Sequence, residues 1–262
     1  MSNYEFIEYS LDNGLARITL NRPKQANALD LPMAKELVAA TQECRDNNDV
    51  RAVLLTGNGK LFCAGGDLAS MAKATGPVDE HLHELASTCH IAYNNILKMR
   101  APVVVAVNGP AAGIGLGLAL IGDVTLAADH ASFLMAYTAA GLSPDGGSSK
   151  LLPLAVGLKR AKDLALTNRK LSASEAENWG IVSQVLPAEA LMPSAEKLAS
   201  RLASGPTNAF GHVKRLMLEA LEVSLQHTLD DEATTIASSA VGADGTEGID
   251  AFMNKRKPEF KG

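Results

Sequence analysis

The chain has 262 residues, of which 47% are hydrophobic, 20% charged and 4% aromatic, and its formal net charge is −5. This composition supports one large hydrophobic core, with room for a smaller appended unit. The acidic balance and the lack of a long basic run argue against nucleic-acid binding. No stretch of sequence approaches the ~20 consecutive apolar residues of a membrane-spanning helix, so we expect no membrane partner.

The cysteines and the N-terminal residues indicate a cellular compartment. Cys44, Cys63 and Cys89 are odd in number and lack CxxC spacing, which favours reduced thiols packed as small core residues. Residues 1–8 include charges and contain no apolar core of a signal peptide. We therefore expect a cytoplasmic α/β protein.

Strands and helices are predicted to alternate in the first part of the chain. Residues 4–10 and 15–20 alternate in polarity, and the Asp12-Asn13-Gly14 sequence between them predicts a hairpin. Asp30 can cap a helix, and residues 50–56 are predicted to form a buried strand. The core positions of that first helix recur at helical spacing: Met33, Leu37, Thr41 and Cys44.

Two glycine-rich stretches each join a predicted strand to a predicted helix. The first is residues 61–68, and the second follows the apolar strand at residues 103–107 and contains Gly113, Gly115 and Gly117. Each glycine inside a helix costs about 1 kcal/mol relative to alanine. We infer that these glycines permit close approach of another element, or of a ligand to the N–H groups at a helix start.

The later elements become mostly helical. Ser172 and Glu175 have the spacing of a capping box for a short helix that Gly180 would end. We expect an α/β core over residues 1–203 and a C-terminal helical region over residues 204–262. Further elements are predicted at residues 78–98 (helix), 123–127 (strand), 157–168 (helix) and 182–186 (strand).

Common catalytic motifs are missing from the chain. The Gly113-Ile114-Gly115 sequence follows a strand, but a dinucleotide-binding fingerprint would need glycine at Leu118 and an acidic residue near Tyr137. No GxSxG pentapeptide of a serine hydrolase occurs. Three histidines share one predicted helix without the spacing of a zinc helix, so no metal site is expected: His81, His83 and His90.

Asp145 lies in a Pro-Asp-Gly-Gly sequence, residues 144–147, which by composition alone predicts a turn. The two glycine-rich stretches add a second interpretation. The residues Gly65-Gly66 and 113–115 could each direct a backbone N–H at one oxygen atom, and paired N–H donors are what a developing oxyanion needs. A structural and a catalytic role for Asp145 both stay open at this point.

Six stretches, taken together and in this order, resemble the crotonase superfamily, also called the enoyl-CoA hydratase/isomerase family. The resemblance implies an α/β, crotonase (ClpP-like) spiral of ββα units with a helical C-terminal trimerisation region. It also implies an acyl-CoA thioester substrate, no separate cofactor because CoA is part of the substrate, and a homotrimer or a dimer of trimers. The stretches are Asn21–Ala28, Phe62–Leu68, Pro102–Gly117, Leu142–Ser149, Ala176–Val182 and Phe252–Phe260.

The resemblance also assigns residues to a site. By position, Gly66 and Ile114 would supply the N–H groups of an oxyanion hole. Lys24 and Lys257 would contact the CoA phosphates, Lys257 from a neighbouring subunit, although a solvated surface lysine is the alternative for each. The residues expected to bind substrate are Lys24, Ala26, Ala64, Gly65, Asp67, Leu68, His90, Tyr137 and Lys257.

The departures from the family pattern bear on the reaction. Hydratases of the family use two glutamates, and the matching positions here hold Gly117 and Tyr137. Asp145 falls where peroxisomal-type enoyl-CoA isomerases, and ring-1,2-epoxyphenylacetyl-CoA isomerases, carry their catalytic carboxylate. The resemblance therefore implies an isomerase that moves a double bond, or isomerises a ring epoxide, on a CoA thioester through a stabilised enolate.

Three other functions stay open. Dehalogenases of the family that act on aryl-halide thioesters resemble this chain in having an aspartate nucleophile at Asp145 and a histidine base at His90, but they carry tryptophan at the position of Tyr137. A hydratase with a non-standard base is a second alternative. A member that binds acyl-CoA without catalysis is a third, and it belongs to a different functional class.

Overall fold

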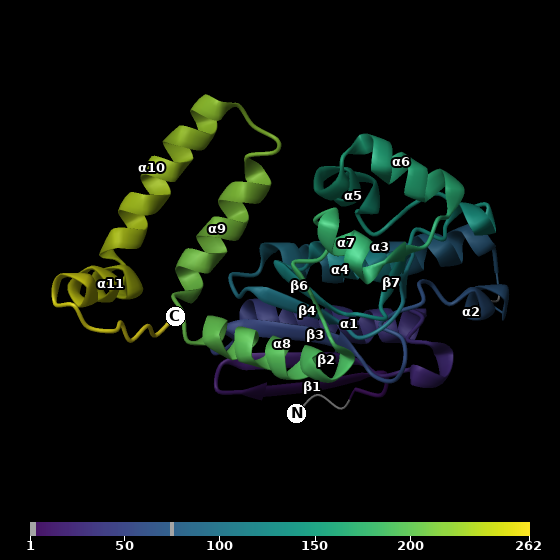
Figure 1. The fold of residues 1–262 in the computed structure, drawn as a ribbon, viewed down its shortest axis with the longest axis horizontal. Coiled ribbons are helices and arrows are strands. Elements are labelled where there is room, and N and C mark those ends of the chain that lie inside the picture. The colour runs from purple at the N-terminus through teal and green to yellow at the C-terminus, as the bar shows by residue number, and fades with distance from the viewer. Residues whose placement is uncertain (1–3, 74–75) are drawn as a thin grey trace.

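The computed structural model describes residues 4–73 and 76–262, and within them a six-stranded sheet forms the centre of the molecule (Figure 1). The strand order is β1-β2-β3-β4-β6-β9; β1 and β2 pair antiparallel, and the other neighbours are parallel. Every residue of β4 is buried, as expected for an interior strand of a parallel sheet. The strands are β1 (Ile7–Asp12), β2 (Leu15–Leu20), β3 (Ala52–Gly57), β4 (Val103–Val107), β6 (Val124–Ala128) and β9 (Gln184–Leu186).

A second, small sheet lies beside the first. It consists of β5 (Ala111–Ala112), β7 (Ser132–Leu134) and β8 (Leu171–Ser172), with β5 parallel to β7 and β7 antiparallel to β8. Two isolated bridges, Cys63 with Ala111 and Leu29 with Gly66, tie the first glycine-rich stretch to its neighbours. The two glycine-rich stretches therefore lie side by side.

The helices begin where the sequence supplies caps. Asp30 accepts a hydrogen bond from the Met33 N–H at 3.1 Å, and Ser172 and Glu175 form the predicted capping box. The α-helices are α1 (Leu31–Asp46), α2 (Leu68–Lys73), α3 (Val78–Lys98), α4 (Ile114–Ile121), α5 (Ser148–Val156), α6 (Leu158–Thr167), α7 (Ala173–Asn178), α8 (Ala188–Ala203), α9 (Thr207–Glu219), α10 (Leu225–Val241) and α11 (Ala243–Met253). Two 3₁₀ helices are η1 (Pro23–Gln25) and η2 (Thr138–Ala140).

The layers of the molecule follow from these elements. Helix α8 packs against β3, β4 and β6, and α1 packs along α3. Helices α9, α10 and α11 extend away from the sheet as an arm (Figure 1). Arg51 ties the arm to the core, because its Nη2 donates to the carbonyl oxygens of Gly205 and Phe260 at 2.8 and 3.0 Å.

The arm exposes large apolar side chains, including those of Ile236, Val241 and Phe252. A subunit interface would bury such side chains, and the predicted trimer or dimer of trimers stays a prediction. Across residues 4–73 and 76–262, no helix combines the length and the apolar character needed to cross a membrane.

Four predicted strands were wrong at one or both ends, by one to three residues. The first strand begins at Ile7 rather than Tyr4 because its register with β2 pairs Ile7 with Leu20 and Asp12 with Leu15. Pairing with neighbouring strands fixes where a strand begins and ends, and the alternation of polar and apolar residues does not reveal that pairing. The other corrected strands are β3, β6 and β9, predicted at residues 50–56, 123–127 and 182–186.

Candidate active site

A largely apolar cavity of about 320 Å³ lies between α2, α3 and the N-terminal end of α4. Residues of the helix α3 and of the segment 136–140 line this one cavity together. The lining residues are Leu29, Ala64, Gly65, Gly66, Leu68, Met71, Leu82, His83, Leu85, Ala86, Cys89, Gly113, Ile114, Ala136, Tyr137, Ala140, Leu142, Ser143 and Asp145.

The two glycine-rich stretches meet at one edge of this cavity. Gly65 and Gly113 have positive φ angles of 108° and 54°, and a Cβ atom added to Gly113 would lie 3.7 Å from the Gly65 Cα. A side chain at either position would therefore meet backbone strain, and a Cβ atom at Gly65 would also lie only 3.2 Å from the Ala112 carbonyl oxygen. The glycines allow the close approach that their sequence predicted.

Gly66 and Ile114 both line the cavity, and they provide two available donors there. Leu29 holds the peptide on either side of Gly66, because its N–H donates to Gly65 O at 2.8 Å and its carbonyl accepts from Asp67 N at 2.9 Å. Within the described ranges, neither the Gly66 N–H nor the Ile114 N–H has an acceptor. Two such donors can stabilise an oxygen atom that gains negative charge.

Asp145 faces this cavity from the turn between η2 and α5. Its carboxylate Oδ1 accepts a hydrogen bond from Tyr137 Oη at 2.5 Å, and its carbonyl accepts from the Ser148 hydroxyl at 2.6 Å. Gly146 and Gly147 follow with positive φ angles of 58° and 71°, which explains the pair of glycines. The turn therefore presents one carboxylate with a fixed orientation.

The Tyr137 hydroxyl is expected to keep its proton and so to remain a hydrogen-bond donor to Asp145. Burial raises the pKa of its phenol, and the neighbouring charge of Asp145 raises this pKa further. A phenol with a raised pKa keeps its proton at neutral pH. The neutral O–H group can then donate its hydrogen bond to the Asp145 carboxylate, which a negatively charged phenolate could not do.

The position of Gly117 leaves no space for a side chain. A Cβ atom there would lie 2.9 Å from the Gly146 carbonyl oxygen and 3.2 Å from the Tyr93 ring. A glutamate at this position would displace the turn that carries Asp145. Among the described residues that line the cavity, Asp145 is the only carboxylate.

His90 and Tyr93 of α3 contact the site from behind the cavity. The Gly146 N–H donates to His90 Nε2 at 3.2 Å, and Tyr93 Oη donates to the Ile114 carbonyl at 2.5 Å. Tyr93 is 4% exposed, and burial raises the pKa of its phenol well above the usual value. His90 thus touches the turn next to Asp145 but does not line the cavity.

The residues predicted to contact CoA divide into two groups. Ala64, Gly65 and Leu68 line the cavity, whereas Lys24 is exposed on η1 and does not line it. Ala26 connects η1 to the site, because its carbonyl accepts from the Ala64 N–H at 3.0 Å.

Asp67 has structural partners. Its Oδ2 pairs with Arg22 Nη2 at 3.1 Å, and its Oδ1 accepts from the Ser70 N–H at 3.0 Å in the first turn of α2. Lys257 is exposed in the segment after α11, which lies at the opposite end of the molecule from α2 (Figure 1). Lys257 therefore does not reach the cavity of its own chain.

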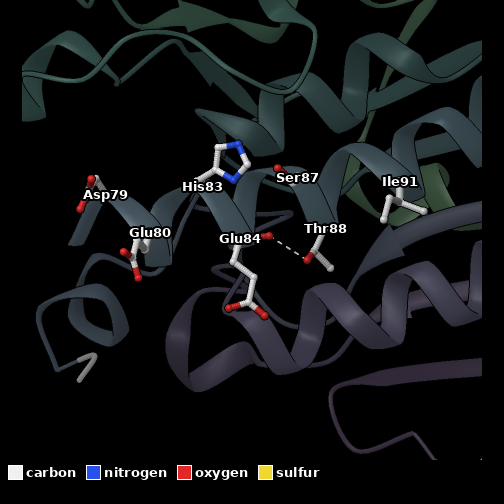
Figure 2. Close-up of a pocket in the computed structure, with 7 residues that line it drawn as sticks. All are labelled: Asp79, Glu80, His83, Glu84, Ser87, Thr88 and Ile91. Carbon is white, nitrogen blue, oxygen red and sulfur yellow. Dashed lines mark hydrogen bonds between the residues drawn. The ribbon is translucent and has the colours of Figure 1, made fainter. Parts of the chain in front are cut away.

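A second, more open cavity of about 650 Å³ lies on the outer face of α3 (Figure 2). In it, the Thr88 hydroxyl donates to the Glu84 carbonyl at 2.7 Å, and Lys35 Nζ lies 3.5 Å from Glu84 Oε1. No group of three or more His, Cys, Asp or Glu side chains in the described part of the chain is placed to hold a metal ion. This cavity has the polar side chains of a solvated helix face: Asp79, Glu80, His83, Glu84, Ser87 and Thr88.

Sequence reasoning missed Tyr93 and Met71. Tyr93 belongs to the buried face of α3, and helical periodicity could identify that face but not its hydrogen bond to α4. Met71 lies on the short helix α2, and a Cβ atom added to Gly66 would be 2.8 Å from its Cε. The proximity of Met71 to Gly66 depends on tertiary packing alone.

The comparisons with known proteins agree with this architecture. A sequence model described as Enoyl-CoA hydratase/isomerase matches residues 10–262. The chain is 38% identical to 1,2-epoxyphenylacetyl-CoA isomerase of Escherichia coli K12, covering 98% of this chain and 99% of that protein. It is 32% identical to 4-chlorobenzoyl coenzyme A dehalogenase-2 of an Arthrobacter species, covering 93% and 88% of the two chains.

A solved structure shows the same fold. The crystal structure of enoyl-CoA hydratase from Bacillus anthracis matches with a TM-score of 0.92 at 32% identity, covering 98% of this chain and 100% of that one. An isomerase, a dehalogenase and a hydratase are thus all similar to this chain at 32–38% identity. The predicted crotonase fold is confirmed, and the chain belongs to the enoyl-CoA hydratase/isomerase family.

Proposed function

We propose that this protein isomerises a CoA thioester, with Asp145 as the single acid/base and the Gly66 and Ile114 N–H groups as the oxyanion hole. The observation that carries the proposal is one carboxylate, fixed by Tyr137, in a cavity that two unpaired N–H groups also line. The relative named as an isomerase agrees with this assignment.

The chemistry follows from the weak acidity of a carbon next to a thioester. Two N–H donors at the thioester oxygen stabilise the enolate that forms when a proton leaves C2. Asp145 takes that proton from C2, the double bond shifts, and the same carboxyl group returns the proton at C4. The proton is conserved, no electrons are lost, and the conjugated 2-enoyl thioester is the product.

The surroundings of Asp145 support a reaction that does not need a second carboxylate. A hydratase of the two-glutamate kind would need acidic side chains at Gly117 and Tyr137. The Gly146 carbonyl lies where a side chain from Gly117 would extend, and the phenol of Tyr137 donates to Asp145. Gly117 thus leaves room for the turn that carries Asp145, and Tyr137 orients its carboxylate. Neither residue supplies a carboxylate to activate water.

The test is a panel of CoA thioesters with wild-type protein and Asp145→Asn. Loss of a general base typically lowers kcat by about 10²–10⁴-fold, so we expect this loss for a 3-enoyl-CoA, or for 1,2-epoxyphenylacetyl-CoA. Exchange of the C2 proton with deuterated water should stop in the same variant. Asp79→Asn, on the outer face of α3, is the matched control and should retain wild-type turnover.

Three outcomes would contradict the proposal. Near wild-type isomerisation by Asp145→Asn would remove the proposed base. Chloride release from 4-chlorobenzoyl-CoA, with a covalent aryl ester on Asp145, would instead identify a dehalogenase. Binding of all the thioesters without turnover of any would point to a non-catalytic member of the family.

A further inference from the structure

We propose that His90 and Tyr93 are positioning residues that fix the distance between the oxyanion hole and Asp145, with His90 acting as a hydrogen-bond acceptor and not as a base. The two residues are three apart on α3, so they share one face of the helix. The inference rests on the proposed function for the roles of Asp145 and Ile114. It concerns what holds these two groups relative to each other.

His90 contacts the turn that carries Asp145. A backbone N–H can only donate, so His90 Nε2 must offer its lone pair to the Gly146 N–H, 3.2 Å away. The imidazole is then neutral, with its proton on Nδ1. The lone pair that a base would use to take a proton is already engaged, and the ring does not line the cavity.

Tyr93 contacts the other half of the site. Its hydroxyl donates to the Ile114 carbonyl at 2.5 Å, at the first residue of α4. The N–H of that same residue is the proposed oxyanion donor. Because burial raises the Tyr93 pKa, the phenol stays protonated and keeps this hydrogen bond at neutral pH.

The Tyr93 ring also fills the space between the two halves. A Cβ atom added to Gly146 would lie 3.1 Å from Tyr93 Cε2 and 3.1 Å from Ile114 Cγ1. A Cβ atom added to Gly117 would lie 3.2 Å from both Tyr93 Cε2 and its hydroxyl oxygen. The ring therefore packs against both α4 and the turn at the place where these two elements meet.

The distance between the oxyanion hole and Asp145 matters because the C2 proton must face Asp145 while the thioester oxygen faces the two N–H groups. A misplacement of about 1 Å can cost roughly 10²-fold in rate. Helix α3 supplies one hydrogen bond to each side of this arrangement. A positioning role for His90 and Tyr93 should affect kcat more than substrate binding.

The test compares His90→Leu, His90→Gln and Tyr93→Phe. Glutamine places an oxygen acceptor near the Nε2 position but cannot serve as a base at neutral pH. We expect His90→Leu to lower kcat by about 10–100-fold with KM nearly unchanged, and His90→Gln to recover kcat to within a few-fold of wild type. Tyr93→Phe keeps the ring but loses the hydrogen bond, and should lower kcat by about 3–10-fold.

A second readout does not depend on turnover. Hydrogen exchange, followed by mass spectrometry, should show faster exchange at residues 143–147 in His90→Leu and normal exchange in His90→Gln. The control is His130→Leu, an exposed histidine whose ring contacts Asp129. If exchange behaves in this way while no thioester is isomerised, the proposed reaction fails and the positioning role stands.

Other outcomes would overturn the inference. Equal loss of activity in His90→Gln and His90→Leu would make His90 a base. Wild-type kcat and wild-type exchange in His90→Leu would remove any role for the hydrogen bond to Gly146. If His90→Leu does not fold, wild-type kcat in Tyr93→Phe together with an inactive His90→Gln would refute the proposal.

Discussion

The proposed role of Asp145 depends on neighbouring residues whose contacts with it cannot be read from the sequence. The composition of residues 144–147 alone predicted a turn and favoured a structural role for Asp145 over a catalytic one. Tyr137, eight residues earlier, supplies the hydrogen bond that orients the carboxylate. The presence of a carboxylate in this turn was predictable, whereas its orientation depends on how the chain runs from η2 to α5.

Replacing Tyr137 tests whether that orientation matters. A hydrogen bond to a charged group contributes about 1.5–3 kcal/mol, so Tyr137→Phe should lower kcat by about 10–100-fold. The ring and its packing stay in place, and KM should change little. The measurement is steady-state kinetics on the best isomerase substrate.

Tyr9→Phe is the control for that substitution, because Tyr9 contacts Cys44 far from the cavity. A Tyr137→Phe variant as active as Tyr9→Phe would show that the hydrogen bond to Asp145 has no part in turnover. The cavity would then depend on the Tyr137 ring for its shape alone.

At the scale of elements, local signals predicted what local interactions determine. The helix at residues 78–98 and the capping box at Ser172 and Glu175 match the structure. The second sheet was not predicted, because β5 and β8 have two residues each and offer no periodicity. Such short strands form only when distant elements bring their partners to them.

Lys214 links the helix α9 to the core of the molecule. This α9 residue lies 2.8 Å from Asp123, and it also donates to the Ile96 and Ala101 carbonyls at 3.1 and 3.0 Å. Burial lowers the pKa of Lys214 and raises the pKa of Asp123, and the pairing offsets part of each change. The pair therefore anchors the arm at a cost in desolvation.

Breaking the Lys214–Asp123 ion pair should lower the free energy of unfolding. Lys214→Met leaves a partly exposed carboxylate without this donor, and we expect a loss of about 2 kcal/mol in the free energy of unfolding. Lys35→Met, which breaks the exposed pair with Glu84, should cost less than about 1 kcal/mol. Urea unfolding at one protein concentration measures both, and equal costs would mean that Lys214 does not anchor α9.

At the scale of the whole molecule, the buried core governs the response to alkaline pH. Cys44, Cys63 and Cys89 are buried, and burial raises the pKa of each thiol to about 12. Their number and spacing predicted core residues, but only the packed structure identifies Cys89 as part of the cavity wall. All three thiols stay protonated in the folded protein well above pH 9.

Stability should therefore fall as pH rises above about 9. Below the pKa of an unfolded thiol, both states are protonated and the thiols add no pH dependence. Above it, the unfolded chain loses protons that the folded chain keeps, so each thiol lowers the free energy of unfolding by up to about 1.4 kcal/mol per pH unit. Three thiols together give a slope of up to about 4 kcal/mol per unit.

Cys63→Ala separates this effect from general alkaline damage. The variant loses some stability at every pH because it removes a buried group, but its slope between pH 9 and 10 should be shallower by about a third. Lys214, whose pKa is lowered, acts in the opposite direction between that lowered pKa and the ordinary lysine pKa of about 10.4, but it does so equally in wild type and in Cys63→Ala, so the difference between their slopes reports the thiol. Parallel urea-unfolding curves for wild type and Cys63→Ala across this window would show that the buried thiols do not control alkaline stability.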